Sequence, residues 1–332
     1  MEILIIGGTR NVGHLLTLEL IQAGYWVTVF NRGQTSDELP VDVPRLRGDR
    51  SDPAQLAQAL AGRSFDVVVD TTLYNGADAQ IITELLDGRV GQYLFLSTGQ
   101  VYLVREELLR PFAEDAYDGT VSQAPPPGTR DHEEWLYGVE KRDAENVLAR
   151  AWQTRRFPCT TLRLPMVNSE RDHFHRIYGY LLRLQDGGPI LLPKGPHLPL
   201  RHVYGDDVVK AIVTVIQTGL GQGSVYNISQ EETLAVEDFL ALLAGIAGYD
   251  LRLTRVDKAL LEQHGFLPDC SPFSDPWMSE LDNQRSKTEL GMQYTPLPDY
   301  LQKLVGHYES HPPPMPEGQQ RRQEEIELAS SL

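Results

Sequence analysis

The segment 1–33 constrains the fold more than any other part of this chain. Residues 2–6 (EILII) are a short apolar run typical of a strand buried on both faces. Gly7, Gly8 and Gly13 follow at once, and the apolar positions from 12 to 23 have helical spacing. Residues 26–30 predict a second strand. A strand, a glycine turn, a helix and a strand in this order are typical of a dinucleotide-binding unit.

The glycines fit that interpretation for steric reasons. Gly7 permits a tight turn, Gly8 lets backbone amides approach a pyrophosphate, and Gly13 lets the helix pack closely on the strand. The motif departs from G-x-x-G-x-x-G because Arg10 takes the place of the middle glycine. We expect the whole turn, Thr9, Asn11 and Val12 included, to meet the cofactor at the helix N-terminus. A tight turn in another kind of α/β protein is the alternative.

The end of the second strand bears on the choice of cofactor. An acidic residue there would bind the adenosine ribose hydroxyls and favour NAD. The strand ends instead in Phe30, Asn31, Arg32 and Gly33, without a carboxylate. Arg32, together with Arg10 across the turn, could bind a 2′-phosphate through forked hydrogen bonds. We therefore expect NADP, with NAD as the alternative; Arg32 could also be a solvated loop residue.

Composition excludes several classes of protein. The chain has 332 residues, of which 41% are hydrophobic and 23% charged, as in an ordinary soluble globule. No apolar run approaches the ~20 residues of a membrane helix, so we expect a cytoplasmic protein without membrane contact. Cys159 and Cys270 have no metal-binding spacing, which predicts a reducing compartment and no metal. A net charge of −16 makes a nucleic-acid partner unlikely.

Strand-like and helix-like segments alternate through residue 165, which predicts a doubly wound, parallel α/β sheet of the Rossmann type. The predicted strands are 2–6, 26–30, 44–48, 66–71, 93–97 and 159–164, and the predicted helices include 53 onward (capped by Asp52), 77–86 and 131–152. Ligands of such sheets bind at the carboxyl ends of the strands. Gly7, Asn31, Asp49, Thr71 and Ser97 all lie at such ends.

The alternation weakens after Pro165, and the family resemblance given below implies a second, smaller α+β domain here that binds substrate. We expect 1–165 plus about 202–228 to form the cofactor domain, and about 166–201 and 229–311 to form the substrate domain. Residues 312–332 are polar and predict a loose tail with at most a terminal helical turn.

The motif YGVEK, residues 137–141, places Tyr137 and Lys141 on one helix face, one turn apart. A lysine ammonium there would favour the phenolate and lower the pKa of the tyrosine toward neutrality, so that it could exchange a proton with an alcohol or carbonyl. Ser97 and Thr98 offer hydroxyls that could orient the same oxygen. A surface Tyr/Lys pair is the alternative.

These motifs resemble those of the short-chain dehydrogenase/reductase superfamily, in its extended or atypical NAD-dependent epimerase/dehydratase branch. The resemblance covers about residues 1–305 and rests on the glycine turn and on STGQVY (97–102), YGVEK (137–141), LRLP (162–165), RHVYGDD (201–207), VYNIS (225–229) and ELGMQYTP (289–296). It implies that Thr98, Tyr137 and Lys141 are catalytic, with substrate in the cleft between two domains. The expected cofactor-binding residues are Gly7, Gly8, Thr9, Arg10, Asn11, Val12, Gly13, Asn31, Arg32, Asp49, Arg50, Thr71, Thr72, Ser97, Tyr137, Lys141 and Pro165.

Two departures from the branch modify this expectation. Dehydratases of the branch carry an Asp-Glu pair directly after the catalytic Thr, where this chain has Gly99 and Gln100. Neither residue exchanges protons, so an epimerase or a reductase is expected rather than a dehydratase. GGTRNVG and VTVFNRG also resemble the atypical subgroup of the chloroplast stem-loop RNA-binding proteins. A non-catalytic, NAD(P)-binding RNA-binding or regulatory protein is therefore the alternative function.

Family position also suggests a substrate, a sugar nucleotide or related polyol, and a possible homodimer through the helices 77–86 and 131–152. On the same grounds Arg163 and Arg201 could hold a substrate phosphate. His173 and His175 alternate without a carboxylate at ligand spacing, so we expect substrate contacts or surface rather than a metal site. The segment 275–277 (DPW) could line the cleft or form a turn with a packed indole.

Overall fold

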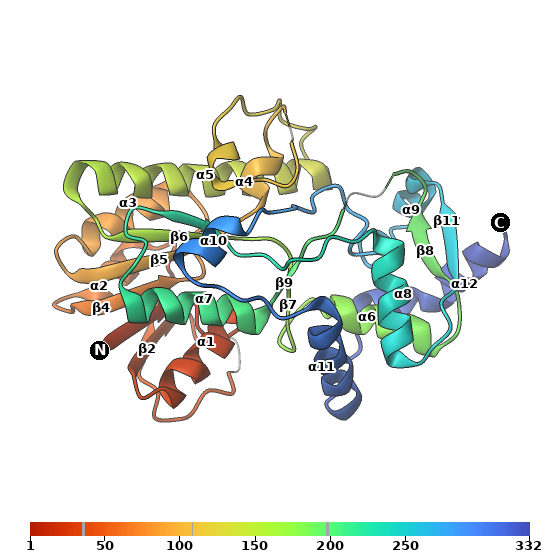
Figure 1. Cartoon of the computed structure of the whole chain (residues 1–332), viewed down its shortest axis with the longest axis horizontal. Helices are drawn as coiled ribbons and strands as arrows, with labels where there is room; N and C mark the ends of the chain where they lie inside the picture. The colour runs from red at the N-terminus through yellow and green to blue at the C-terminus, as the bar shows by residue number, and fades with distance from the viewer. Residues whose placement is uncertain (35–36, 108, 197–198) are drawn as a thin grey trace.

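A seven-stranded sheet, in which every pair of neighbouring strands is parallel, forms the centre of one lobe of the molecule (Figure 1). The computed structural model describes residues 1–34, 37–107, 109–196 and 199–332. The strand order is β10-β6-β5-β4-β1-β2-β3, which confirms the predicted doubly wound α/β fold. The strands are β1 (Glu2–Ile6), β2 (Trp26–Asn31), β3 (Arg45–Arg47), β4 (Phe65–Asp70), β5 (Val90–Thr98), β6 (Cys159–Leu164) and β10 (Val225–Asn227).

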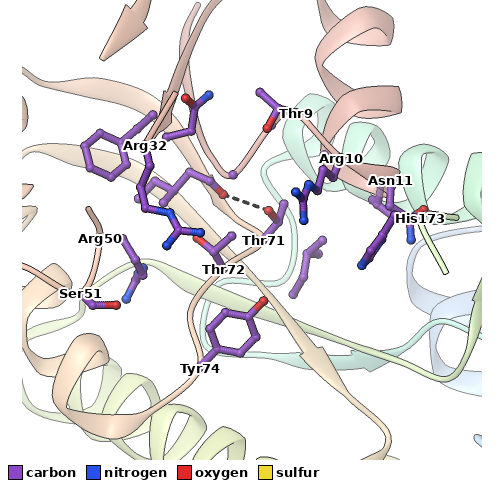
Figure 2. Close-up of a pocket in the computed structure, with 18 of the residues that line it drawn as sticks. Thr9, Arg10, Asn11, Arg32, Arg50, Ser51, Thr71, Thr72, Tyr74 and His173 are labelled. Atoms are coloured by element: carbon purple, nitrogen blue, oxygen red, sulfur yellow. Dashed lines mark hydrogen bonds between the residues drawn. The ribbon is translucent and has the colours of Figure 1, made fainter. Parts of the chain in front are cut away.

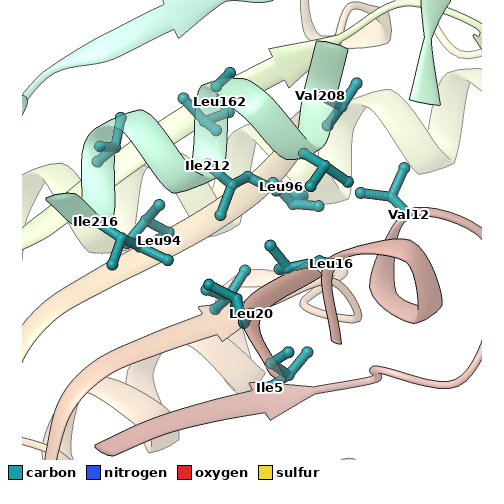
Figure 3. Close-up of a cluster of buried hydrophobic side chains, with 14 of the residues drawn as sticks. Ile5, Val12, Leu16, Leu20, Leu94, Leu96, Leu162, Val208, Ile212 and Ile216 are labelled. Atoms are coloured by element: carbon teal, nitrogen blue, oxygen red, sulfur yellow. The ribbon is translucent and has the colours of Figure 1, made fainter. Parts of the chain in front are cut away.

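Helices cover both faces of this sheet, because side chains of each buried strand alternate between the faces. Ile3 and Ile5 of β1 share one apolar core with α1 (Asn11–Gln22) and α7 (Gly205–Thr218), and Figure 3 draws Ile5 in this core together with Leu20 of α1 and Ile212 of α7. Leu4 and Ile6 point the other way, into a core shared with α2 (Pro53–Leu60), α3 (Gly76–Leu85) and α5 (Arg130–Arg155). Asp52 caps α2 as predicted, since its carboxylate accepts hydrogen bonds from the amides of Ala54 and Gln55.

A second lobe with its own apolar core follows the sheet and lies at the right of Figure 1. Its main elements are α6 (Arg176–Gln185), β8 (Ile190–Pro193), α8 (Val236–Ala247), β11 (Leu253–Val256), α9 (Lys258–Gln263) and α11 (Leu297–Ser310). Shorter elements are α4 (Gln100–Leu103), η1 (Glu114–Tyr117), β7 (Val167–Asn168), β9 (Val203–Tyr204) and α10 (Gln284–Glu289). In the described parts of the chain, no helix combines the length and the apolar character that crossing a bilayer requires.

One part of the segment expected in the second domain returns to the sheet. Leu290, Met292 and Tyr294, which follow α10, are buried in the core that α1 and α7 share. Asp207 at the start of α7 accepts hydrogen bonds from the backbone amide and the hydroxyl of Thr295, at 2.7 and 2.9 Å. Amphipathic spacing alone does not tell which of two cores a short helix joins.

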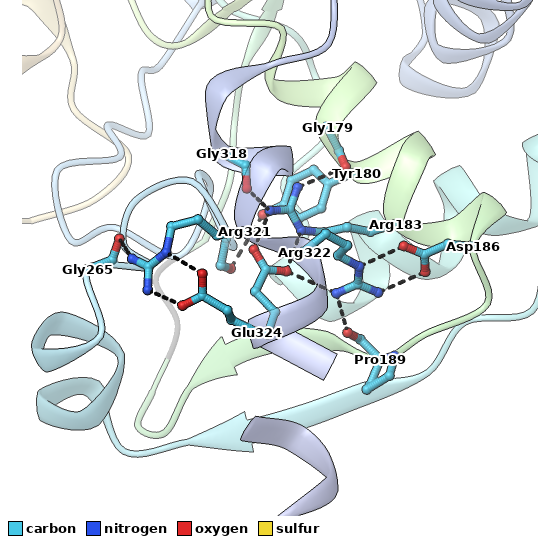
Figure 4. A network of polar contacts seen from close by, with 12 residues as sticks. Gly179, Tyr180, Arg183, Asp186, Pro189, Gly265, Gly318, Arg321, Arg322 and Glu324 are labelled. Carbon is cyan, nitrogen blue, oxygen red and sulfur yellow. Dashed lines mark hydrogen bonds and ion pairs between the residues drawn. The ribbon is translucent and has the colours of Figure 1, made fainter. Parts of the chain in front are cut away.

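The C-terminal segment is more ordered than the loose tail expected from its polarity. Residues 317–321 form η2 (Glu317–Arg321), and α12 (Arg322–Ser330) follows it. Figure 4 shows the polar network that holds them: Arg322 pairs with Asp186 at the end of α6, and Arg183 of α6 donates to the carbonyl of Gly179. Glu325, only 1% exposed, accepts from Arg183 at 2.6 Å. Charge pairing holds this segment together with Leu328 and Ala329, which pack against a small apolar cluster, and its polar composition alone indicated disorder.

Candidate functional site

Two adjoining cavities lie at the carboxyl edge of the sheet. The first, called the crevice below, has a volume of about 540 Å³ and runs along the ends of β1, β2, β3, β4 and β5. Every residue expected to bind the cofactor lines it, and so does Thr98. The second, called the outer cavity, has a volume of about 880 Å³ and reaches into the second lobe. Thr98, Tyr137 and His173 line both.

The glycine turn forms one wall of the crevice, seen in Figure 2 through Thr9, Arg10 and Asn11. Gly7 has φ +110°, a conformation that favours glycine, and a Cβ on it would come within 1.9 Å of the Thr71 hydroxyl oxygen. A Cβ on Gly13 would come within 2.8 Å of the Gly8 amide nitrogen, so only glycine lets α1 start this close to the turn. The first amides of α1 have no intrahelical acceptor, and the N-cap residue, Arg10, offers no side-chain oxygen. This wall fits an anionic pyrophosphate.

The end of β2 supplies the next part of the crevice. Asn31, Arg32 and Ser51 line it, and Figure 2 shows Arg32 extending into the cavity. The Asn31 side-chain oxygen accepts from the Gly33 amide at 2.9 Å, whereas its buried side-chain nitrogen has no partner among the described residues and could donate to a ligand. Arg50 lines the same region, but Asp70 and Asp78 hold its guanidinium. Arg50 therefore stabilises the wall of the crevice. Arg32 supplies a positive charge at the crevice surface near the end of β2.

The hydroxyl, phenol and amine expected to be catalytic meet at the other end of the crevice. Thr98 ends β5, while Tyr137 and Lys141 lie one turn apart on α5, which the Thr129 side chain caps through the His132 amide. The Thr98 and Tyr137 side chains are hydrogen-bonded. Lys141 is 2% exposed, and its amine donates to the Leu96 carbonyl at 2.9 Å. The nitrogen lies 5.8 Å from the centre of the Tyr137 ring.

The sequence predicted that Lys141 would lower the pKa of Tyr137, but burial has the larger effect on this pKa. Burial raises the pKa of Tyr137 above its ordinary value, although the hydrogen bond to Thr98 opposes the shift. Burial also lowers the pKa of Lys141 to about 7, despite the nearby carboxylates of Asp70 and Glu145. Lys141 is buried and Tyr137 is half-buried, so for both side chains lost solvation outweighs the effect of neighbouring charges. At neutral pH Tyr137 is therefore a protonated phenol, able to donate.

Two arginines expected near a substrate phosphate lie elsewhere. Arg163, 2% exposed, is held by Glu145 in an ion pair, and its guanidinium also donates to Tyr102. The same carboxylate accepts from Ser97 at 2.5 Å, so this pair supports the floor of the crevice. Arg201 donates to Thr233 and to the Leu281 carbonyl. Among the residues that the structure describes, neither arginine lines the crevice or the outer cavity. Strand positions alone could not show which face these side chains take.

Other expected residues do lie at the site. His173 lines both cavities, and His175, Asp275 and Trp277 line the outer cavity. The indole of Trp277 donates to Asp131 at 2.9 Å, which joins the segment 275–277 to the start of α5.

Sequence reasoning missed several lining residues. Tyr74 and Ser51 follow strand ends already identified, so their position after Thr72 and Arg50 was a usable signal. Glu134 lies three residues before Tyr137, on the same face of α5, and accepts a hydrogen bond from the Gln100 side chain. Burial raises its pKa. The segment 314–319 also lines the outer cavity, and nothing in its composition indicated this.

Comparison with known proteins agrees with this architecture. The chain is 26% identical over 263 residues to the chloroplast stem-loop binding protein of 41 kDa b of Arabidopsis thaliana, covering 75% of this chain and 64% of that protein. It is 23% identical over 238 residues to 2'-dehydrokanamycin reductase of Streptomyces kanamyceticus, covering 70% of this chain and 63% of the reductase. The chain thus spans slightly less than two thirds of the length of these relatives.

Solved structures share the fold across nearly the whole chain. A dTDP-glucose 4,6-dehydratase from Bacillus anthracis, in complex with NAD, superposes with a TM-score of 0.74 at 16% identity, covering 94% of this chain and 97% of that one. A UDP-glucose 4-epimerase from Thermotoga maritima, with UDP-glucose, gives a TM-score of 0.71 at 20% identity, covering 93% and 99%.

A sequence model of one family matches residues 3–229, more than half of the chain. The matched segment runs from β1 through β10 and contains the glycine turn, Thr98, Tyr137 and Lys141. The chain belongs to the NAD dependent epimerase/dehydratase family.

Proposed function

We propose that this protein is an NAD(P)-dependent oxidoreductase or epimerase that acts on a hydroxyl or carbonyl carbon. The observation that carries the proposal is the position of Thr98, Tyr137 and Lys141. They line the same crevice as the glycine turn, and Thr98 and Tyr137 also face the outer cavity, where a substrate would enter. A proton-exchanging phenol between a dinucleotide cradle and a second cavity is what hydride transfer at a carbinol carbon requires.

The residues of the crevice suit a nicotinamide dinucleotide. The glycine turn and the first amides of α1 would hold the pyrophosphate, and Asp49 with Arg32 would flank the adenosine. Because β2 ends without a carboxylate and Arg32 extends into the crevice, we infer a preference for NADP over NAD. Thr71, Thr72, Ser97 and Pro165 would complete the wall toward the nicotinamide ring.

When bound, the cofactor supplies or accepts the hydride. Tyr137 donates its phenolic proton to the substrate oxygen as a carbonyl is reduced, and takes it back in the oxidative direction. The raised pKa keeps the phenol protonated at neutral pH, which suits the donor role. Thr98 orients the same oxygen through its hydroxyl. Lys141, buried one turn further along α5, would hold the nicotinamide ribose and, when charged, would stabilise the tyrosinate formed during the transfer.

Reduction or epimerisation fits the site better than elimination of water. Gly99 and Gln100 follow Thr98 directly, and neither side chain exchanges protons. The relative from Streptomyces is named a reductase, and the Thermotoga structure that shares the fold is an epimerase. Several structures that share the fold are enzymes of sugar nucleotides, which supports a sugar-like substrate.

RNA binding is the second candidate function, favoured by the similarity to a protein named for binding a stem-loop. The net charge of −16 and the retention of Tyr137 with Lys141 favour the enzyme instead. A gel-shift titration with stem-loop RNA at two salt concentrations distinguishes them. Tight binding that weakens with salt and does not depend on Tyr137 supports the RNA function.

Replacing the phenol tests the enzyme directly. In Tyr137→Phe we expect kcat for NADPH-dependent reduction of a panel of sugar and polyol carbonyl compounds to fall by roughly 10²–10⁴. NADPH affinity, measured by calorimetry, should stay within about threefold, since the ring remains. Tyr74→Phe is the matched control, because Tyr74 lines the same crevice and its ring lies 6.3 Å from that of Tyr137. Equal activity of wild type and Tyr137→Phe would contradict the proposal.

A further inference from the structure

The outer cavity is lined by more carboxylates than cations. Its carboxylates are Glu133, Glu134, Asp269, Asp275 and Glu317, and its guanidiniums are Arg130, Arg176 and Arg183. No lysine lines it within the described residues. Counting carboxylates and guanidiniums alone, the wall carries a formal excess of two negative charges.

Each of the three arginines is already ion-paired. Arg130 pairs with Asp275 at 2.7 Å and with Glu134 at 3.3 Å. Arg183 pairs with Glu325 at 2.6 Å, where both side chains are almost fully buried. A ligand phosphate would therefore have to displace a carboxylate from its partner.

Arg176 shows the same arrangement. Its guanidinium pairs with Asp172 at 3.0 Å and packs over the Phe174 ring, 4.3 Å from the ring centre. Glu133, Asp269 and Glu317, by contrast, are exposed at the rim, and none makes an ion pair with a lysine or arginine of the described segments. The cavity thus lacks the uncompensated cations that recognise phosphate and offers spare carboxylates instead.

Glu134, although it is paired with Arg130, places a carboxylate at the reacting end of the cavity. The Gln100 side chain, which also contacts the Thr98 hydroxyl at 3.5 Å, donates to one of its oxygens, and Arg130 pairs with the other. Each carboxylate oxygen can accept a second hydrogen bond. An ammonium or hydroxyl group bound there would lie beside Thr98 and Tyr137, which line the same cavity.

We propose that the outer cavity selects an amine-bearing polyol without phosphate groups, and that Glu134 is a specificity-determining residue that binds its ammonium group. The proposal rests on the proposed function, because it takes the outer cavity as the substrate site. It differs from the sugar-nucleotide class expected from family position, since a nucleoside diphosphate would bring its charge against a negative rim and find every lining arginine neutralised.

Matched ring compounds test this selection. Wild-type protein, with and without NADPH, is titrated with 2-deoxystreptamine, scyllo-inositol, myo-inositol 1-phosphate and UDP-glucose, and binding is followed by saturation-transfer NMR. We expect 2-deoxystreptamine to bind at least about tenfold more tightly than scyllo-inositol, and the two phosphorylated probes to bind more weakly than either. A phosphorylated probe that binds as tightly as the amine overturns the proposal, and so does failure of the amine to bind.

Two variants locate the effect at Glu134. Glu134→Gln should weaken amine binding about tenfold, whereas Glu140→Gln, the same change on α5 outside the cavity lining, should leave it unchanged. The double variant E134Q/D275N releases Arg130 from both partners and should gain affinity for UDP-glucose. Equal amine affinity in wild type and Glu134→Gln overturns the role of this residue. NADPH binding, measured separately, reports on the proposed function: a protein that binds NADPH but prefers phosphorylated probes loses only the substrate inference.

Discussion

The crevice and the outer cavity adjoin at Tyr137 but are built in different ways. The crevice is formed by strand ends of one rigid sheet, by backbone amides and by glycines that permit close approach. The outer cavity is assembled from the start of α5, residues 173–183, 268–279 and 314–319. Ion pairs such as Arg130–Asp275 and Arg183–Glu325 join these distant segments. The first region should therefore be sensitive to added side-chain atoms, and the second to lost charges.

The largest expected effect is on the charge network of the second region. Glu325→Gln leaves the buried guanidiniums of Arg183 and Arg322 without their shared carboxylate, and we expect it to cost about 3 kcal/mol in the free energy of unfolding. Urea-induced unfolding measures this. Glu324→Gln is the control, since Glu324 forms an exposed pair with Arg321 whose loss should shift the unfolding midpoint much less. Equal midpoints for the two variants would mean that the network does not hold α12.

Added atoms should have the next largest effect, and in the first region only. Gly13→Ala places a Cβ 2.8 Å from the Gly8 amide nitrogen, so α1 must move away from the turn. We expect a loss of about 1–3 kcal/mol in stability, and weaker NADPH binding. Gly245→Ala in α8 meets no atom within 4 Å and should stabilise the protein by about 0.5–1 kcal/mol. If both variants behave alike, the close approach at Gly13 has no energetic role.

A smaller effect is expected on the pH dependence of stability. It tests the burial of Lys141, which lies where the two regions meet. The pKa of Lys141 is about 7 in the folded protein against 10.5 ordinarily, so between these values the unfolded chain binds more protons. Wild-type stability should therefore rise with pH across this window, relative to Lys141→Met, by at most about 1.4 kcal/mol per pH unit.

The control for this prediction is Lys210→Met, because Lys210 is 58% exposed. It should follow wild type throughout the window, as measured by urea unfolding at several pH values. A constant difference between wild type and Lys141→Met would show that burial does not lower the lysine pKa.

The same contrast explains what the sequence could predict. The crevice residues follow strand ends, and the parallel order of the sheet brings such ends to one edge, so position along the chain was sufficient. Tyr137 and Lys141 were predictable because helical spacing fixes a shared face.

Glu134, Arg176 and the segment 314–319 meet only through tertiary packing, and no local pattern encodes that meeting. Arg163 was misplaced because the face of a strand that points to a ligand depends on register. The C-terminal segment appeared disordered because its ion pairs, and the contacts of Leu328 and Ala329 with an apolar cluster, form only through tertiary packing.

Calorimetric titration of wild-type protein with NADPH and NADH tests the central claim, that the crevice holds a nicotinamide dinucleotide beside Tyr137. We predict one dinucleotide per chain and an affinity for NADPH about tenfold above that for NADH, a preference that Arg32→Ala should abolish. Absence of binding by either dinucleotide would contradict the account.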